Sequence, residues 1–164
     1  MGSTPSLYDH AVALDIDAAG KTALLGALAA EVAQRLGRAE DEILGVLQDR
    51  ERLGSTALGR GVALPHAQLG QLAHPALSFA RLRRPIDFGA RDGEPVDLVL
   101  LVLWPADSPQ DFLPALAEIC RVLREPKLLR RLRGAAAAGQ ALALLRAAGC
   151  DAPGGSQTRE TDAR

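Results

Sequence analysis

Aromatic residues are scarce in this sequence, and charges of the two signs nearly cancel. Only 3% of the 164 residues are Phe, Trp or Tyr, so the chain lacks the aromatic platforms on which base-stacking proteins bind nucleic acid. The 19 basic and 20 acidic side chains give a formal net charge of −1, whereas proteins that bind polyanions usually carry a basic excess. Both features indicate that nucleic acid is not a partner.

Cysteine and long apolar runs are also scarce. Cys120 and Cys150 are far apart and form no C-x-x-C pattern, so neither a zinc site nor a disulfide framework is indicated. The longest mostly apolar run, 96–104, contains Asp97 and is about half as long as a membrane-spanning helix. No N-terminal stretch has the features of a signal peptide. The sequence therefore predicts a cytoplasmic protein without membrane contact, metal or other cofactor.

Apolar periodicity indicates one domain that contains both helices and strands. The spacing predicts helices over 21–36, 40–51, 108–123, 127–133 and 139–148, and strands near 12–15, 62–64, 77–82 and 96–104. This order predicts an α/β fold, a single domain with a mixed central β-sheet flanked by helices on both faces. We expect 1–6 to be a flexible N-terminus, 7–149 to form the domain and 150–164 to be a disordered tail.

One segment, Arg50–His66, concentrates groups that suit the chemistry of anions. Its glycines let backbone N–H groups approach an anion closely, and its arginines offer a planar fork that matches phosphoryl oxygens. His66 follows a short strand and Pro65, and imidazole can act as a nucleophile at neutral pH. A nucleophile beside an anion cradle suits transient phosphorylation of a histidine, although ordinary turns with a structural histidine can share this pattern.

The same segment resembles a known active-site signature. Its Gly-Ser-Thr, Gly-x-Gly and Leu-Pro-His resemble the signature of enzyme IIA domains of the sugar phosphotransferase system. The similarity is to the fructose/mannitol type, which includes a nitrogen-related regulatory branch, and it extends over roughly 7–148. In that family the histidine accepts a phosphoryl group from a phosphohistidine carrier protein.

The resemblance implies a role for each candidate residue. His66 would be the phosphoryl acceptor, and Arg50 would stabilise the phosphoryl charge. Ser55, Thr56 and Arg60 would belong to the phosphoryl-binding loop. The implied partners are an HPr-like phosphocarrier protein and regulated target proteins, and the chain would be a phosphoryl carrier rather than a multiple-turnover enzyme.

The sequence departs from the family pattern in two places. The family usually has a second active-site histidine early in the helix at 108–123, and our alignment puts Pro114 there, with Phe112 at a neighbouring polar position. Proline offers no side-chain donor and no backbone N–H. Ala67-Gln68 replaces a pair that often carries a positive charge in relatives, and Arg60 could restore that charge. Two hypotheses therefore stay open: a phosphorylated regulator, or a non-phosphorylated binding module of the same fold with a vestigial His66.

Apart from the residues named above, the sequence offers only weak candidates for a catalytic or binding role. A hydrolase or metal enzyme would need acids near His66; Glu51 and Asp107 are the candidates, without metal-ligand spacing. We expect His74 to lie on the surface and His10 to have no role. The remaining basic cluster is either a solvated helical face or a docking face for an acidic partner; it comprises Arg121, Arg124, Arg130, Arg131 and Arg133.

Overall fold

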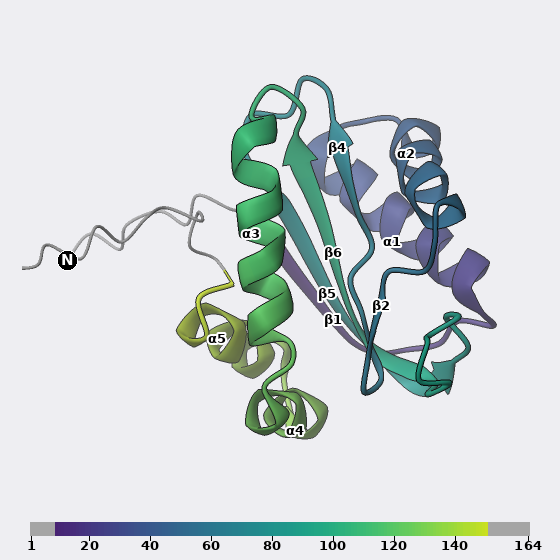
Figure 1. The fold of residues 1–164 in the computed structure, drawn as a ribbon, viewed down its shortest axis with the longest axis vertical. Helices are drawn as coiled ribbons and strands as arrows, with labels where there is room; N and C mark the ends of the chain where they lie inside the picture. Colours follow the sequence, from purple (N-terminus) through teal and green to yellow (C-terminus); the bar gives the residue numbers. More distant parts are fainter. Residues whose placement is uncertain (1–8, 151–164) are drawn as a thin grey trace, which may run out of the picture.

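The computed structural model describes residues 9–150, which form a β-sheet between two layers of helices (Figure 1). The elements, in chain order, are β1 (Asp9–Ile16), α1 (Lys21–Leu36), α2 (Glu40–Arg52), β2 (Ala57–Gly59), β3 (Val62–Ala63), β4 (His66–Leu69), β5 (Ala76–Ile86), β6 (Val96–Pro105), α3 (Pro109–Val122), α4 (Pro126–Gly134) and α5 (Ala138–Ala147). The predicted α/β class is confirmed. The expected flexible N-terminus and the tail after Cys150 lie outside the described residues, and Cys150 itself is buried.

The sheet is mixed, and β6 lies at its centre. The strand order is β1-β5-β6-β3-β2, and β4 pairs with the same edge of β6 as β3 does. β1 runs parallel to β5, β5 antiparallel to β6, and both β3 and β4 parallel to β6. Nearly every residue of β6 is buried, as the continuous apolar run predicted.

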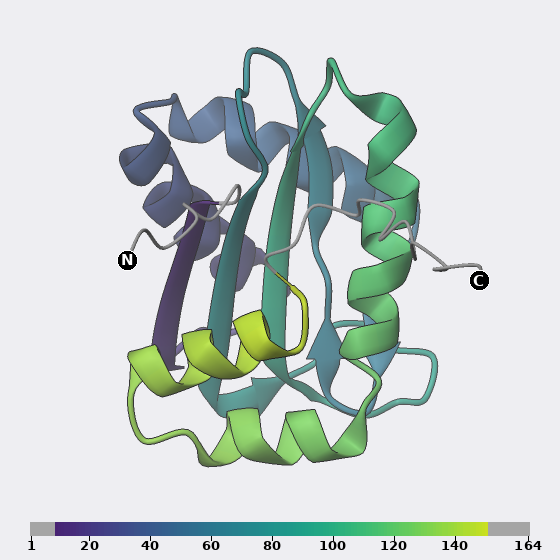
Figure 2. The ribbon, with the colours of Figure 1, turned by 90° about the vertical axis from the view of Figure 1, so that its left-hand side faces the viewer.

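The helices divide into two layers that cover opposite faces of the sheet. α1 and α2 pack on one face, and α3, α4 and α5 lie on the other (Figure 2). Successive residues of a strand point to opposite faces. Leu100 and Val102 therefore join the core beneath α3, whereas Val99 and Leu101 join the core beneath α1.

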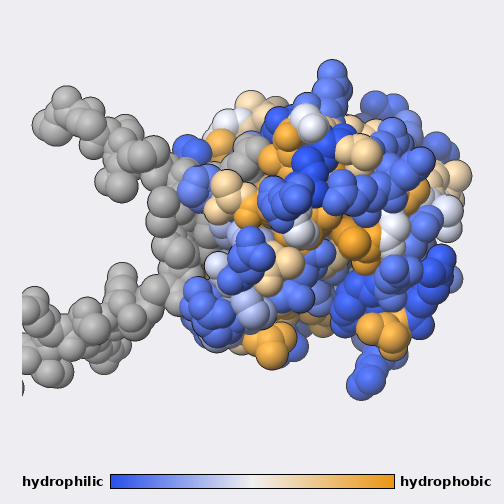
Figure 3. Space-filling view, turned by 90° about the horizontal axis from the view of Figure 1, so that it is seen from above, coloured by the Kyte–Doolittle hydropathy of each residue, from blue (hydrophilic) through white to orange (hydrophobic). Residues whose placement is uncertain are grey.

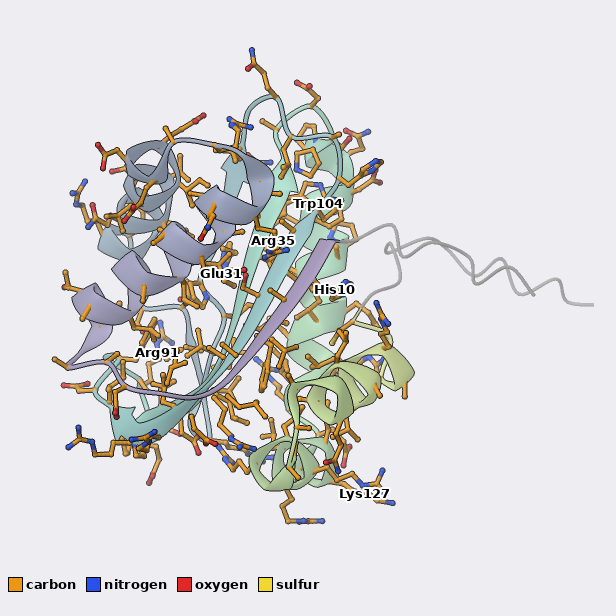
Figure 4. The ribbon with its side chains drawn as sticks, turned by 180° about the vertical axis from the view of Figure 1, so that it is seen from behind. His10, Glu31, Arg35, Arg91, Trp104 and Lys127 are labelled. Carbon is orange, nitrogen blue, oxygen red and sulfur yellow. The ribbon has the colours of Figure 1, made fainter. Side chains whose placement is uncertain are left out.

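A partly buried polar network around the buried Ser78 ties α1 to β5. The Ser78 hydroxyl donates to Glu31 Oε2 at 2.9 Å, and Arg35 Nη2 donates to Ser78 Oγ at 2.7 Å and to the Leu77 carbonyl at 3.2 Å. Figure 4 shows Glu31 and Arg35 extending from α1 toward the sheet. Because buried polar groups are costly unless they are hydrogen-bonded, this network fixes α1 against the strand.

Between the predicted helix at 40–51 and the predicted strand at 62–64, the chain forms β2 and a tight turn into β3. Gly59, Arg60 and Gly61 all have positive φ values, of 88°, 57° and 79°. At Gly61 the positive φ would strain any other residue, and a Cβ there would lie only 3.3 Å from the Pro95 carbonyl oxygen. The turn returns the chain to β6.

Pro65 interrupts pairing with β6 but does not end it, contrary to the expected strand end at Leu64. Proline lacks an N–H, but the Pro65 carbonyl accepts a hydrogen bond from the Val102 N–H at 2.9 Å. Pairing then resumes at His66, which lies opposite Val102. The interruption therefore places His66 at the start of a strand held by the central β6.

No helix within residues 9–150 is both long and apolar enough to cross a membrane. Seen from the end at which β4 and β6 finish, the surface is mostly hydrophilic, with separate apolar patches (Figure 3).

Candidate functional site

His66 is held by hydrogen bonds that define its tautomer. Its Nδ1 lies 2.8 Å from the Leu64 carbonyl oxygen. A carbonyl oxygen can only accept, so Nδ1 carries the hydrogen and Nε2 keeps its lone pair. The ring is partly buried, and its nucleophilic nitrogen faces the end of α2.

Arg50, in the last turn of α2, contacts that nitrogen. Its Nε donates to His66 Nε2 at 3.2 Å, and its Nη1 donates to the Gly54 carbonyl at 3.0 Å. Arginine has no acceptor, so this contact independently requires the lone pair to be on Nε2. The fold thus brings together two residues that the sequence analysis singled out.

The environment of His66 favours its neutral form. Burial lowers the pKa of the imidazole below its usual value, and the positive charge of Arg50 lowers it further. The Leu64 hydrogen bond and the negative charge of Glu51 oppose this shift in the pKa without cancelling it. His66 therefore presents a neutral, unprotonated Nε2 at pH 7.

Glu51 fixes the loop beside His66. Its carboxylate accepts from the Thr56 hydroxyl and from the Thr56 backbone N–H, and it forms an ion pair with Lys21 at 2.6 Å. The carboxylate side chain is only 7% exposed. The sequence analysis considered Glu51 only as an acid or a metal ligand. Its ion-pair partner Lys21 lies far earlier in the chain, on α1, and no local pattern links the two.

Ser55 is also used structurally. Its hydroxyl donates to the Phe88 carbonyl at 2.7 Å and accepts from the Ala57 N–H at 3.2 Å. Ser55 and Thr56 thus form a shaped wall whose hydroxyls are already engaged, with Glu51 behind it.

Two hollows meet at Arg50 and His66. The inner one, of about 230 Å³, is lined by Arg50, Ser55, Thr56, Ala57, Leu58, Leu64, His66, Leu116 and Cys120. The outer one, of about 560 Å³, opens to the surface between α2 and α3 and includes the exposed side chains Leu53 and Leu113. A small anion in the inner hollow would lie against both Arg50 and His66.

The residue that α3 turns toward His66 is Phe112, not Pro114. The rings of Phe112 and His66 meet edge to face with centroids 5.9 Å apart, and Phe112 also packs beside Trp104. Pro114 is exposed and lines neither hollow. Residues two apart on a helix point to nearly opposite sides. Pro114, which our alignment put at the position of the second histidine, therefore points away from His66, and Phe112 is the α3 residue that contacts the imidazole.

Arg60 is not brought to His66. Its Nη1 donates to the Arg124 carbonyl at 3.2 Å, and its side chain lines a separate cleft. His74 and Asp107 are exposed and line neither hollow at His66. Within residues 9–150, no cluster of three or more His, Cys, Asp or Glu side chains could hold a metal ion.

Comparisons with known proteins point to one family. The model of the family described as "Phosphoenolpyruvate-dependent sugar phosphotransferase system, EIIA 2" matches residues 6–148. A nitrogen regulatory protein of Bradyrhizobium diazoefficiens is 48% identical over 113 residues, which are 69% of this chain and 74% of that protein.

Solved structures share the fold. The crystal structure of nitrogen regulatory protein IIA-Ntr from Neisseria meningitidis has a TM-score of 0.78 at 28% identity, covering 82% of this chain and 92% of that one. Enzyme IIA mannitol from Escherichia coli, solved in complex with phosphorylated enzyme IIB mannitol, has a TM-score of 0.67 at 17% identity and covers 83% of this chain and 94% of that one.

Proposed function

Because this chain belongs to the EIIA 2 family of the phosphoenolpyruvate-dependent sugar phosphotransferase system, we propose that it carries a phosphoryl group on Nε2 of His66. The group would come from an HPr-like phosphohistidine carrier protein. The chain would then pass it on, or signal by its phosphorylation state to target proteins, in the cytoplasm. The observation that carries this proposal is the fixed tautomer of His66, whose Nε2 lone pair is held beside Arg50.

The transfer needs no separate base. The Nε2 lone pair attacks phosphorus in line, the bond between phosphorus and the donor nitrogen breaks, and its electron pair stays with the donor imidazole. The proton on Nδ1 remains there, and the ring becomes cationic. The Leu64 carbonyl, 2.8 Å from Nδ1, stabilises that positive charge.

Arg50 has a different role before and after transfer. Before transfer its Nε donates to the His66 lone pair, which orients the ring. On transfer that lone pair becomes the bond to phosphorus, so the guanidinium is released to donate to phosphoryl oxygens in the inner hollow. Ser55 and Thr56 shape the wall of this hollow, while their hydroxyls stay bonded to Phe88 and Glu51.

The relatives favour a regulatory role. The Bradyrhizobium and Neisseria proteins are both named nitrogen regulatory proteins, and we propose the same kind of role here. An enzyme IIA relative was solved with a phosphorylated IIB partner, which supports a protein as the donor or receiver of the phosphoryl group.

One observation favours the second candidate, a binding module with a vestigial histidine. Phe112 lies against the His66 ring and has no hydrogen-bond donor for a phosphoryl group. This module would bind its partner equally well whether or not a phosphate is present.

Phosphoryl transfer from the carrier tests the proposal. We expect incubation with the phosphorylated carrier protein to give an acid-labile, base-stable phosphate on the wild type and none on His66→Ala. Arg50→Gln should slow labelling by about 100-fold, because charge-stabilising donors at a reacting centre contribute roughly that much. His74→Ala is the matched control and should label normally. Labelling that survives His66→Ala overturns the assignment, and an unlabelled wild type favours the vestigial module.

A further inference from the structure

A second cleft, of about 650 Å³, lies away from His66. It is enclosed by the loop before β2, the β2–β3 turn, the loop after β5 and the end of α3. Its lining residues are Gly54, Ser55, Ala57, Leu58, Gly59, Arg60, Gly89, Arg91, Asp92 and Arg124. Neither His66 nor Arg50 is among them, and Ser55 belongs to the wall shared with the inner hollow at His66.

Two guanidinium groups in this cleft are available to a ligand. Arg91 and Arg124 are exposed, and neither guanidinium makes a hydrogen bond or an ion pair within residues 9–150. Figure 4 shows Arg91 toward the end of the sheet opposite to Trp104. Arginine forks match the geometry of phosphate oxygens.

Arg60 has a structural role in the cleft. Its backbone N–H donates to Asp92 at 2.8 Å, its Nη1 donates to the Arg124 carbonyl at 3.2 Å, and its own carbonyl accepts from Arg133. These bonds hold the two sides of the cleft together, so its walls are formed before a ligand enters.

Asp92 supplies a fixed acceptor among these cations. One carboxylate oxygen accepts from the Arg60 N–H and the other from the Glu94 N–H at 3.0 Å, and these bonds lower the pKa of Asp92. Each oxygen keeps a further lone pair. A Cβ at Gly59 would lie 3.1 Å from Asp92 Oδ2, so the glycine leaves the carboxylate accessible. Such an acceptor suits hydroxyl groups and repels a second anion.

We propose that this cleft binds a small phosphorylated molecule that also carries hydroxyl groups, of the sugar phosphate class. Arg91 and Arg124 would take the phosphate, and Asp92 would accept hydrogen bonds from hydroxyls. The cleft volume lies within the range of small-molecule sites, about 300–1,000 Å³. This site does not depend on phosphorylation of His66, because no residue that holds the imidazole contributes to it.

Binding of a hexose phosphate to the full chain tests the proposal. We use glucose 6-phosphate as the probe and follow amide shifts in NMR spectra and heat by calorimetry. Glucose without phosphate should bind far more weakly, and inorganic phosphate should be intermediate. The double variant Arg91→Gln/Arg124→Gln should weaken binding of the hexose phosphate by about tenfold or more, since charge-assisted hydrogen bonds are the strong ones.

Controls separate this site from its alternatives. Arg130→Gln/Arg131→Gln, which removes two exposed arginines from α4, should bind as the wild type does. His66→Ala should also bind normally, whatever the outcome of the phosphorylation assay. Asp92→Asn should weaken the binding of glucose 6-phosphate more than it weakens the binding of inorganic phosphate.

Three results would overturn the proposal. They are equal binding by the Arg91→Gln/Arg124→Gln and wild-type proteins, loss of binding in His66→Ala, and preferential binding of an oligoglutamate peptide, which would indicate an acidic protein partner instead.

Discussion

At the scale of single residues, the His66 ring is defined by one acceptor and one donor. Leu64 accepts from Nδ1 and Arg50 donates to Nε2, so the deprotonated nitrogen is also the one that faces the hollow. The same surroundings bury the ring, which disfavours its charged form. Nucleophilicity and a lowered pKa therefore have a common structural origin.

This lowered pKa makes stability depend on pH. The folded-state pKa of His66 lies below its usual value, so between the unfolded value of about 6.5 and the folded value the unfolded chain binds more protons. The free energy of unfolding should therefore fall as the pH falls below about 6.5, until the folded pKa is reached. Urea unfolding from about pH 7 to pH 5 should show a steeper loss for the wild type than for His66→Gln. Parallel curves would contradict the shift.

Phe112 gives a second prediction at this scale. Phe112→His should place an imidazole donor beside His66 and lengthen the lifetime of the phosphorylated form by up to about tenfold. Pro114→His, on the exposed side of α3, should leave that lifetime unchanged. The measurement is the rate of loss of labelled phosphate, with Phe112→Leu as an apolar control. A longer lifetime of the phosphorylated form in Pro114→His alone would show that position 114, not position 112, is the one that faces His66.

At the scale of elements, Glu51 joins three segments. It lies near the end of α2, pairs with Lys21 at the start of α1 and accepts two hydrogen bonds from Thr56 in the loop before β2. Because the Glu51 carboxylate is buried, removing any one of these partners leaves the carboxylate incompletely paired, which costs free energy.

Glu51→Gln should therefore destabilise the protein by about 1–3 kcal/mol, because it leaves Lys21 without its counter-charge and weakens both bonds to Thr56. Denaturant unfolding measures this change. Glu42→Gln on the same helix removes an exposed pair with Arg38 and should have little effect. Equal effects of the two variants would show that Glu51 is merely a surface charge.

The elements also show how far sequence reasoning reaches. The helix spacing predicted α1 at 21–36 and set the other helices within a residue or so, because apolar periodicity is local. β2 and β4 were missed for different reasons. β2 has only three residues and two glycines close to it, so it shows no apolar alternation, and β4 pairs with β6, which is distant in sequence. The site divides in the same way. Arg50, Glu51 and His66 belong to one motif, whereas the Lys21–Glu51 ion pair and the Phe112–His66 contact join distant segments that a single sequence does not link.

At the scale of the whole molecule, two hollows of different character lie on either side of a shared wall formed by Ser55, Ala57 and Leu58. Around His66, α2 and α3 present apolar side chains, and Leu53 and Leu113 are 85% and 72% exposed. The cleft at the β2–β3 turn is instead lined by arginines and an aspartate. Exposed apolar side chains around a reactive group are typical of a protein-docking surface, whereas a polar cleft suits a small anion.

The apolar rim yields the last prediction. If a carrier protein docks over His66, Leu53→Asp and Leu113→Asp should each slow phosphoryl transfer from it by about tenfold, because a charge in the centre of an interface is left unpaired. The folded state should be unaffected, because both side chains face solvent, so the thermal midpoint should not change. Ala143→Asp, on an exposed position of α5, should transfer at the wild-type rate. The rates are measured from quenched time courses of labelling with the phosphorylated carrier. Normal transfer rates in both leucine variants would place the docking surface elsewhere.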